Sequence, residues 1–186
     1  AAMPALREFL PQFASKTQPL RVTVTLTDAG LDVQLGDVRG KLTPVLRARI
    51  AEGATAMAIC RVVIDGEIVF EALAPFLMFG ATRVDIPPGI FIQAVSQAEA
   101  EMAKAAVAAT VKAKHVVDLF SGAGALSFPL ARHARVTAFD SDKVAIAALS
   151  AATRKATHIK PVIAAFRDLF REPLSARELA EFDAIV

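Results

Sequence analysis

The stretch VVDLFSGAG, residues 116–124, decides the fold of the second half of this chain. It begins with apolar, β-branched residues typical of a buried strand and ends in a glycine pair that predicts a tight turn. A helical pattern follows at residues 125–133. A strand that leads through a glycine turn into a helix is typical of an open parallel sheet, which binds ligands at the carboxyl ends of its strands.

Strand and helix alternate on both sides of this stretch. Ser96 and Glu99 form a capping box that predicts a helix reaching to about residue 114. Further strands are expected at 115–120, 135–139 and 161–165, with a helix at 143–157 and another strand from Phe182 to Val186. This order predicts an α/β fold, a parallel sheet with helices on both faces. Because the last strand only begins at Phe182, we expect the sheet to continue past Val186.

The first half has a different pattern. A short helix is expected at 4–16, a hairpin at 21–35, and a helix from Pro44 to Glu52. A second hairpin joins residues 58–64 to 67–73 through Asp65-Gly66, a pair suited to a type I′ turn. Pro87-Pro88-Gly89 marks a break. The sequence therefore predicts a small α+β domain at 1–86, followed by the parallel-sheet domain at 87–186.

Composition excludes several classes of protein. The 186 residues are 54% hydrophobic, so they can bury a core, and 21 basic against 19 acidic residues leave a net charge of only +2. One cysteine and three scattered histidines indicate neither a disulfide framework nor a metal site. Neither a leader nor a spanning segment is recognisable, so we expect a cytoplasmic protein without a membrane partner.

One local basic cluster could contact RNA phosphates. It consists of Arg39, Lys41, Arg47 and Arg49. Such a cluster is more often a solvated face, so it is only a weak RNA-binding hypothesis.

The charge of Asp118 indicates which ligand the glycine turn accepts. Gly122 and Gly124 lack the third glycine of the dinucleotide fingerprint, which is replaced by Ser127. A carboxylate just ahead of the loop would repel a pyrophosphate and attract the ammonium and sulfonium groups of S-adenosylmethionine. The residues therefore favour the methyl donor over NAD.

Two more aspartates follow strands at the same predicted edge. Asp140 ends the second strand, where a carboxylate can accept hydrogen bonds from both ribose hydroxyls of a nucleoside. Asp168 follows the third strand and could accept a hydrogen bond from an adenine amino group. The alternative is that both aspartates only cap turns or helices, as aspartate after a strand often does.

Five short motifs resemble the RNA uracil-C5 methyltransferases, S-adenosylmethionine-dependent class I enzymes that make 5-methyluridine in tRNA and rRNA. They are PGIFIQ at 88–93, DLFSGAG at 118–124, AFD at 138–140, RDLF at 167–170 and FDAIV at 182–186. The Phe-Ile-Gln element is the most specific of them. The resemblance implies that Gln93, Phe120, Gly122, Asp140 and Asp168 line the donor site, although Gln93 alone would be taken for a surface residue.

The chain also departs from that family. Ala125 replaces a frequent polar residue, and the Asp-Pro-Pro-Arg-like motif, the nucleophilic cysteine and the general base that the family places after the last strand are not present. The family's RNA-binding barrel and iron-sulfur cysteines are also missing. Cys60 lies in an apolar strand and is expected to be core, not a nucleophile.

The resemblance thus implies a parent RNA (uracil-5-)-methyltransferase, of which these residues hold the donor site and no catalytic residue. We expect the 186-residue chain itself to be inactive. Two alternatives stay open: a methyltransferase for a substrate other than RNA, and a non-catalytic module that binds RNA or another partner.

Overall fold

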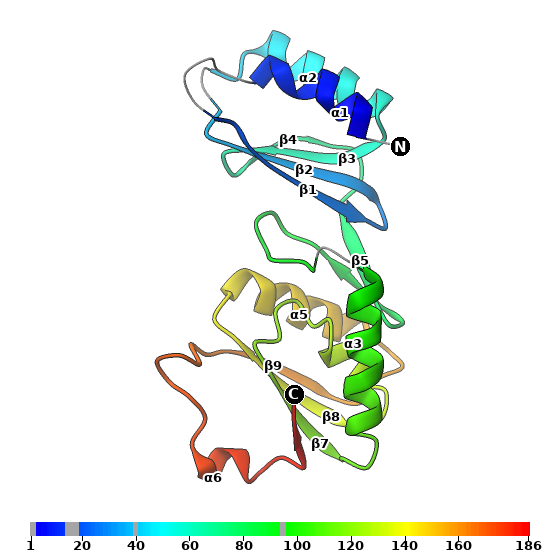
Figure 1. Cartoon of the computed structure of the whole chain (residues 1–186), viewed down its shortest axis with the longest axis vertical. Coiled ribbons are helices and arrows are strands. Elements are labelled where there is room, and N and C mark those ends of the chain that lie inside the picture. Colours follow the sequence, from blue (N-terminus) through cyan, green and yellow to red (C-terminus); the bar gives the residue numbers. More distant parts are fainter. Residues whose placement is uncertain (1–2, 14–18, 39–40, 94–95) are drawn as a thin grey trace. The chain divides into compact units, whose positions relative to one another are not determined.

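The computed structural model describes residues 3–13, 19–38, 41–93 and 96–186, which fall into two compact units, Ala1–Phe76 and Leu77–Val186 (Figure 1). This boundary lies earlier than the one predicted after residue 86. The hairpin of β5 (Phe76–Phe79) and β6 (Thr82–Asp85) explains the difference, because Phe79, Val84 and Ile86 are buried in the core of the second unit. Pro87-Pro88 therefore marks a turn within the second unit.

The first unit is a four-stranded sheet with helices on one face. Its strands lie in the order β1-β2-β3-β4, with β1 and β2 antiparallel, β2 and β3 parallel, and β3 and β4 antiparallel. The predicted Asp65-Gly66 turn is confirmed, since both residues have positive φ, 47° and 87°. The elements are α1 (Met3–Phe9), a 3-10 helix (Leu10–Phe13), β1 (Arg21–Thr27), β2 (Gly30–Gly36), α2 (Pro44–Ala56), β3 (Ile59–Ile64) and β4 (Glu67–Glu71).

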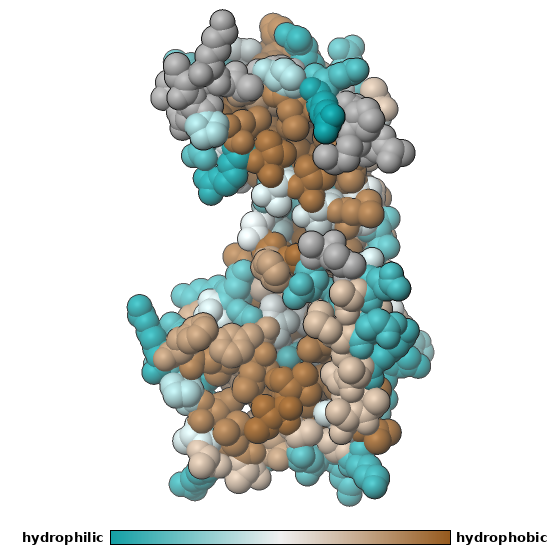
Figure 2. Space-filling view, in the orientation of Figure 1, coloured by the Kyte–Doolittle hydropathy of each residue, from teal (hydrophilic) through white to brown (hydrophobic). Residues whose placement is uncertain are grey.

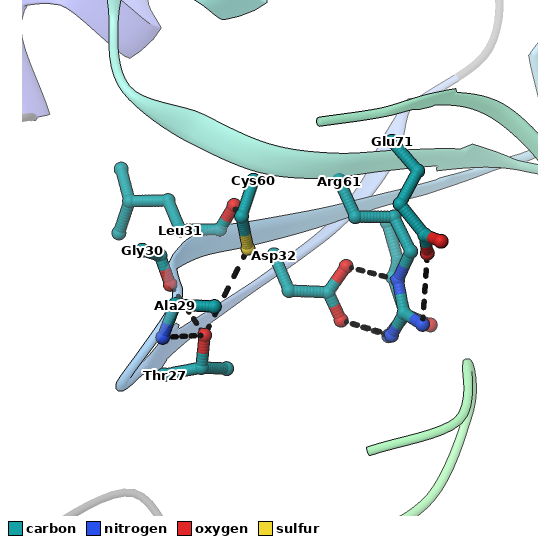
Figure 3. Close-up of polar contacts among 9 residues, drawn as sticks. Thr27, Ala29, Gly30, Leu31, Asp32, Cys60, Arg61 and Glu71 are labelled. Atoms are coloured by element: carbon teal, nitrogen blue, oxygen red, sulfur yellow. Dashed lines mark hydrogen bonds and ion pairs between the residues drawn. The ribbon is translucent and has the colours of Figure 1, made fainter. Parts of the chain in front are cut away.

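A buried ion pair lies on this sheet (Figure 3). Arg61 donates from Nε and Nη2 to the two carboxylate oxygens of Asp32, each at 2.8 Å, and the two side chains are only 3% and 1% exposed. Such a pair joins β2 to β3, and loss of either partner would leave a buried charge uncompensated.

Cys60 is buried beside this pair, as predicted. Its Sγ donates to the carbonyl of Leu31 at 3.2 Å and lies 3.8 Å from the Thr27 hydroxyl. Burial raises the pKa of the Cys60 thiol, which disfavours the thiolate that a nucleophile needs.

The second unit confirms the predicted parallel α/β sheet. Its strands lie in the order β10-β7-β8-β9, all parallel, so the strand that carries the glycine turn is central. The elements are α3 (Ser96–Ala109), β7 (His115–Leu119), α4 (Ser127–Leu130), β8 (Arg135–Asp140), α5 (Lys143–Lys155), β9 (Val162–Phe166), α6 (Ala176–Leu179) and β10 (Ala184–Ile185).

Only one face of this sheet carries a core in the described residues. Val116 and Val136 pack there with Leu149 of α5, and residues of α3 and α4 complete the cluster. On the other face Ile163 and Ile185 are 55% and 53% exposed, and Figure 2 shows a hydrophobic area over these strands. The sequence predicted helices on both faces of the sheet. In the part of the chain that is described, helices cover only one face.

Candidate functional site

The turn after β7 is built by residues with left-handed backbone. Phe120, Gly122 and Gly124 have φ of 59°, 53° and 99°. A Cβ on Gly124 would lie 2.8 Å from the ring of Phe128 and 3.1 Å from Leu149, so this glycine is needed for packing. A Cβ on Gly122 would meet nothing within 4 Å. Of the two glycines, Gly122 is therefore the one whose backbone faces open space.

Asp118 is almost completely buried just before this turn. It is 2% exposed, and the Ser127 hydroxyl donates to its Oδ2 at 2.5 Å. Burial raises the pKa of Asp118 to about 6, the hydrogen bond from Ser127 opposes this rise, and the negative charge of Asp140 adds to it. Ser127, at the place of the missing third glycine, thus orients the carboxylate. A buried carboxylate with one strong partner favours a cationic ligand.

A pocket of about 200 Å³ opens at this end of β7. Four predicted site residues line it: Gln93, Asp118, Phe120 and Gly122. Three of the remaining predicted residues, Gly124, Asp140 and Asp168, are outside its lining.

Sequence reasoning missed two polar residues of this pocket. Glu99 of α3 lines it, and burial raises the pKa of its carboxyl. Ser121 also lines it, and its buried hydroxyl has no hydrogen-bond partner within the described structure. Glu99 was recognised only as a capping residue, because no spacing relates it to Asp118. The lining therefore holds two carboxylates and an unpaired hydroxyl, and no lysine or arginine.

The Asp140 carboxylate accepts hydrogen bonds from the turns after β7 and β8. Its Oδ2 accepts from the Gly122 amide at 2.7 Å and its Oδ1 from the Asp142 amide at 2.8 Å. Asp142 in turn caps α5 by accepting from the amides of Val144 and Ala145. Asp140 therefore does cap turns, as the alternative interpretation predicts. Each of its carboxylate oxygens nevertheless keeps a lone pair that could bind a ligand.

Asp168 caps the turn after β9. Its Oδ1 accepts from the amides of Phe170 and Arg171, at 3.1 and 3.2 Å. Phe170 is 88% exposed, and its ring lies 5.3 Å from the ring of Phe120. This aromatic pair brings the β9 loop next to the pocket, although Asp168 itself is not in the lining.

The weak basic cluster is only partly described, because Arg39 lies outside the described residues. Arg47 forms an ion pair with Glu67 at 2.7 Å, which compensates its charge. Lys41 and Arg49 are exposed. Within the described ranges, at most two residues of the cluster, Lys41 and Arg49, thus have charges free to contact RNA phosphates.

No set of three or more histidine, cysteine, aspartate or glutamate side chains is arranged to hold a metal ion in the described part. Nor does any helix described there have the length and apolar character needed to cross a bilayer.

The parallel sheet, with a glycine turn and a pocket at the carboxyl end of an inner strand, has the fold of the class I methyltransferases. The solved tRNA (uracil-54, C5)-methyltransferase of Pyrococcus abyssi, in complex with S-adenosyl-L-homocysteine, has this fold, with a TM-score of 0.71 and 16% identity over 99% of this chain and 48% of its own. Trm5 of Methanocaldococcus jannaschii, solved in complex with adenosine, has a TM-score of 0.54 and a sequence identity of 17%, over 88% of this chain and 52% of its own.

In sequence, the chain is similar to bacterial proteins named uncharacterized RNA methyltransferases. One from Rhizobium meliloti is 43% identical over 182 residues, 97% of this chain and 43% of the relative. One from Caulobacter vibrioides is 40% identical over 191 residues, 100% of this chain and 46% of the relative. The chain thus spans a little under half the length of these relatives. No model of a known protein family matches it.

Proposed function

We propose that these residues form the donor-binding part of an S-adenosylmethionine-dependent RNA methyltransferase. The observation that carries the proposal is the acidic lining of the pocket after β7, where Asp118 and Glu99 stand without a compensating cation. The names of the sequence relatives support RNA as the substrate.

The pocket suits the donor chemically. Asp118 and Glu99 would attract its ammonium and sulfonium groups, and the free Ser121 hydroxyl would bind a polar group. The exposed rings of Phe120 and Phe170 offer an apolar surface for adenine. Asp140 and Asp168 would bind ribose and adenine with the lone pairs that remain beside their turn contacts and, for Asp168, beside the ion pair of its Oδ2 with Arg171 at 3.5 Å. When bound, the donor supplies an electrophilic methyl group.

The finer proposal is methylation of uracil C5 in tRNA or rRNA. Its support is the set of five motifs and the likeness in fold to the Pyrococcus abyssi enzyme over nearly the whole chain. Uracil C5 needs a thiolate added to C6 and a base that removes the C5 proton. Cys60 is buried in the other unit, so the proposal assigns no catalytic residue to these 186 residues.

Methyl transfer tests this function directly. Labelled S-adenosylmethionine is incubated with unmodified tRNA and rRNA, with the 186-residue chain or with a longer protein of the length of the relatives. We expect 5-methyluridine, identified by mass spectrometry of the nucleosides, with the longer protein only. Methylation of a base other than uracil would instead favour a different RNA methyltransferase activity, and label in protein or small molecules would favour the non-RNA alternative. Labelling by the short chain at the same rate would require a catalytic role for Cys60.

Donor choice has a separate test. S-adenosylhomocysteine should raise the melting temperature of the chain, whereas NAD at the same concentration should not, because only a ligand of the native state stabilises it. If NAD alone raised the melting temperature, the assignment of the pocket would be wrong. If neither ligand did, the non-catalytic alternative would be favoured.

A further inference from the structure

A second and larger pocket lies outside the donor site. It has a volume of about 770 Å³ and is lined by side chains of β6, of the turn after α4, and of the end of α5 with the loop after it. Arg132 in this lining precedes β8, and His158 precedes β9, so the pocket lies at the amino ends of these strands. The donor pocket lies at the carboxyl end of β7 and shares only one element with it, the β5–β6 hairpin with its turn.

The charge of this pocket is opposite to that of the donor site. Arg83, Arg132 and Lys155 line it, against a single carboxylate, Asp85. Arg83 Nε and Lys155 Nζ both bind Asp85, at 2.9 and 3.1 Å, and the hydrogen bond from Lys155 is the main reason why the pKa of Asp85 is lowered. Asp85 is therefore bound by two of the three cations of the lining.

Arg132 is the cation that remains. It is exposed at the rim and forms no ion pair with any residue of the described ranges. Lys155 would be expected at its position in any case, because basic side chains stabilise the carboxyl ends of helices and α5 ends there. That explanation does not apply to Arg83 on a strand or to Arg132 after the short helix α4. The pocket thus contains an exposed arginine, Arg132, whose charge no ion pair within the described residues compensates.

Part of the pocket lining is apolar. Phe128 and Ala152 belong to the buried core and line the pocket together with two threonines, Thr82 and Thr157. The guanidinium and hydroxyl groups of the lining residues are of the kind that donate to phosphate oxygens. The volume exceeds that of a single ion and lies in the range of small-molecule sites, which leaves room for the adjoining sugar.

We propose that this pocket binds a backbone phosphate of the RNA substrate, at the sheet edge opposite the methyl donor. The inference rests on the proposed function, since it takes RNA as the ligand. Phosphate contacts of this kind position a nucleic acid without reading its bases. The pocket would therefore hold the RNA in register while another part of it reaches the methyl group.

The test compares Arg132→Ala with Arg154→Ala. Both remove one arginine charge, but Arg154 lies on α5 outside the lining. Binding of a fluorescently labelled, unmodified tRNA transcript to the 186-residue chain is measured over a series of salt concentrations. We expect Arg132→Ala to bind more weakly and to lower the slope of log Kobs against log salt by about 0.7 to 0.9, the loss of one phosphate contact. Arg132→Lys should restore part of the affinity, and Arg154→Ala should match the parent protein.

Equal binding by Arg132→Ala and Arg154→Ala would overturn the inference. A thermal shift with S-adenosylhomocysteine on the same samples separates this from failure of the proposed function. If the chain binds S-adenosylhomocysteine and its affinity for RNA does not depend on Arg132, only the phosphate site is disproved. If it binds neither S-adenosylhomocysteine nor RNA, the proposed function is disproved as well. A further arm uses inorganic phosphate alone. If phosphate stabilises the parent but not Arg132→Ala while RNA affinity is unchanged, the pocket takes a free phosphate ligand, which also overturns the inference.

Discussion

At the scale of single residues, Asp118 combines the charge that we propose attracts the donor with a cost in stability. The pKa of this buried carboxyl is about 6 in the folded chain against 3.8 for an ordinary aspartate, so the folded state binds more protons between these two values. Stability therefore falls as pH rises through this window, and ionised Asp118 costs up to about 3 kcal/mol at neutral pH.

The isosteric variant Asp118→Asn should thus melt at a higher temperature than the parent protein at neutral pH without ligand. Asparagine can still accept the hydrogen bond from Ser127 while carrying no charge. Calorimetry measures the difference, which should shrink as the pH falls from about 6 to below 3.8, where Asp118 is protonated in both states. A variant that is less stable than the parent at neutral pH would show that the carboxylate is better solvated than its burial indicates.

Donor binding should show the opposite pH dependence. Protonation removes the charge that attracts the donor's ammonium group, so affinity for S-adenosylhomocysteine should fall as pH decreases through about 6 and below. Isothermal titration at a series of pH values measures this, and Asp118→Asn should bind weakly at every pH. A parent protein whose affinity does not change between neutral and acidic pH would exclude Asp118 from the contact with the cation.

Asp140 needs a control for its structural role. Asp140→Ala should weaken S-adenosylhomocysteine binding by about tenfold to a hundredfold, or roughly 1.5 to 3 kcal/mol, through lost ribose contacts and a loosened Gly122 amide. Asp142→Ala removes the cap of α5 beside it and should cost about 1 kcal/mol of stability with little loss of affinity. Lys41→Ala should change neither quantity. If Asp140→Ala and Asp142→Ala weakened binding equally, Asp140 would act only through the turn.

At the scale of elements, the two glycines of the turn after β7 should differ in what a methyl group does. Gly124→Ala places a Cβ against Phe128 and Leu149, so we expect it to cost about 1 to 3 kcal/mol in addition to the strain of its positive φ. Gly122→Ala adds strain of about 1 to 2 kcal/mol but meets open space. Urea denaturation of both variants measures the difference, and equal midpoints would contradict the packing argument.

At the scale of the whole molecule, the exposed sheet face of the second unit should promote association. Ile163 and Ile185 are each about half exposed on this sheet face, and Figure 2 shows a hydrophobic area over the strands of the second unit. Sedimentation of the 186-residue chain should show concentration-dependent association, which Ile163→Thr reduces while S-adenosylhomocysteine binding persists. Ile68→Thr in β4 of the first unit is the control, since it removes an exposed isoleucine elsewhere. A chain that stays monomeric at all concentrations would contradict this expectation.

The sequence by itself determined the order of most elements and where the candidate site is expected, but it did not indicate the β5–β6 hairpin. Alternation and helical periodicity are local properties, so they predicted the hairpins of the first unit and the strands and helices of the second. The glycine turn and Asp118 could be assigned to the carboxyl end of a parallel strand because strand, turn and helix follow one another in the chain. The same local signals misplaced the domain boundary, since two prolines mark a break in the chain whether or not a domain ends there.

Only the tertiary structure decided which distant residues share a site. Glu99 and Ser121 join Asp118 at one pocket, and Arg83, Arg132 and Lys155 form another, through packing between segments that no spacing in the sequence relates. The pKa of Asp118 was equally invisible, because it depends on burial by the surrounding fold. Local geometry follows from neighbours along the chain, whereas burial and charge environment arise from long-range contacts that exist only after the chain has folded.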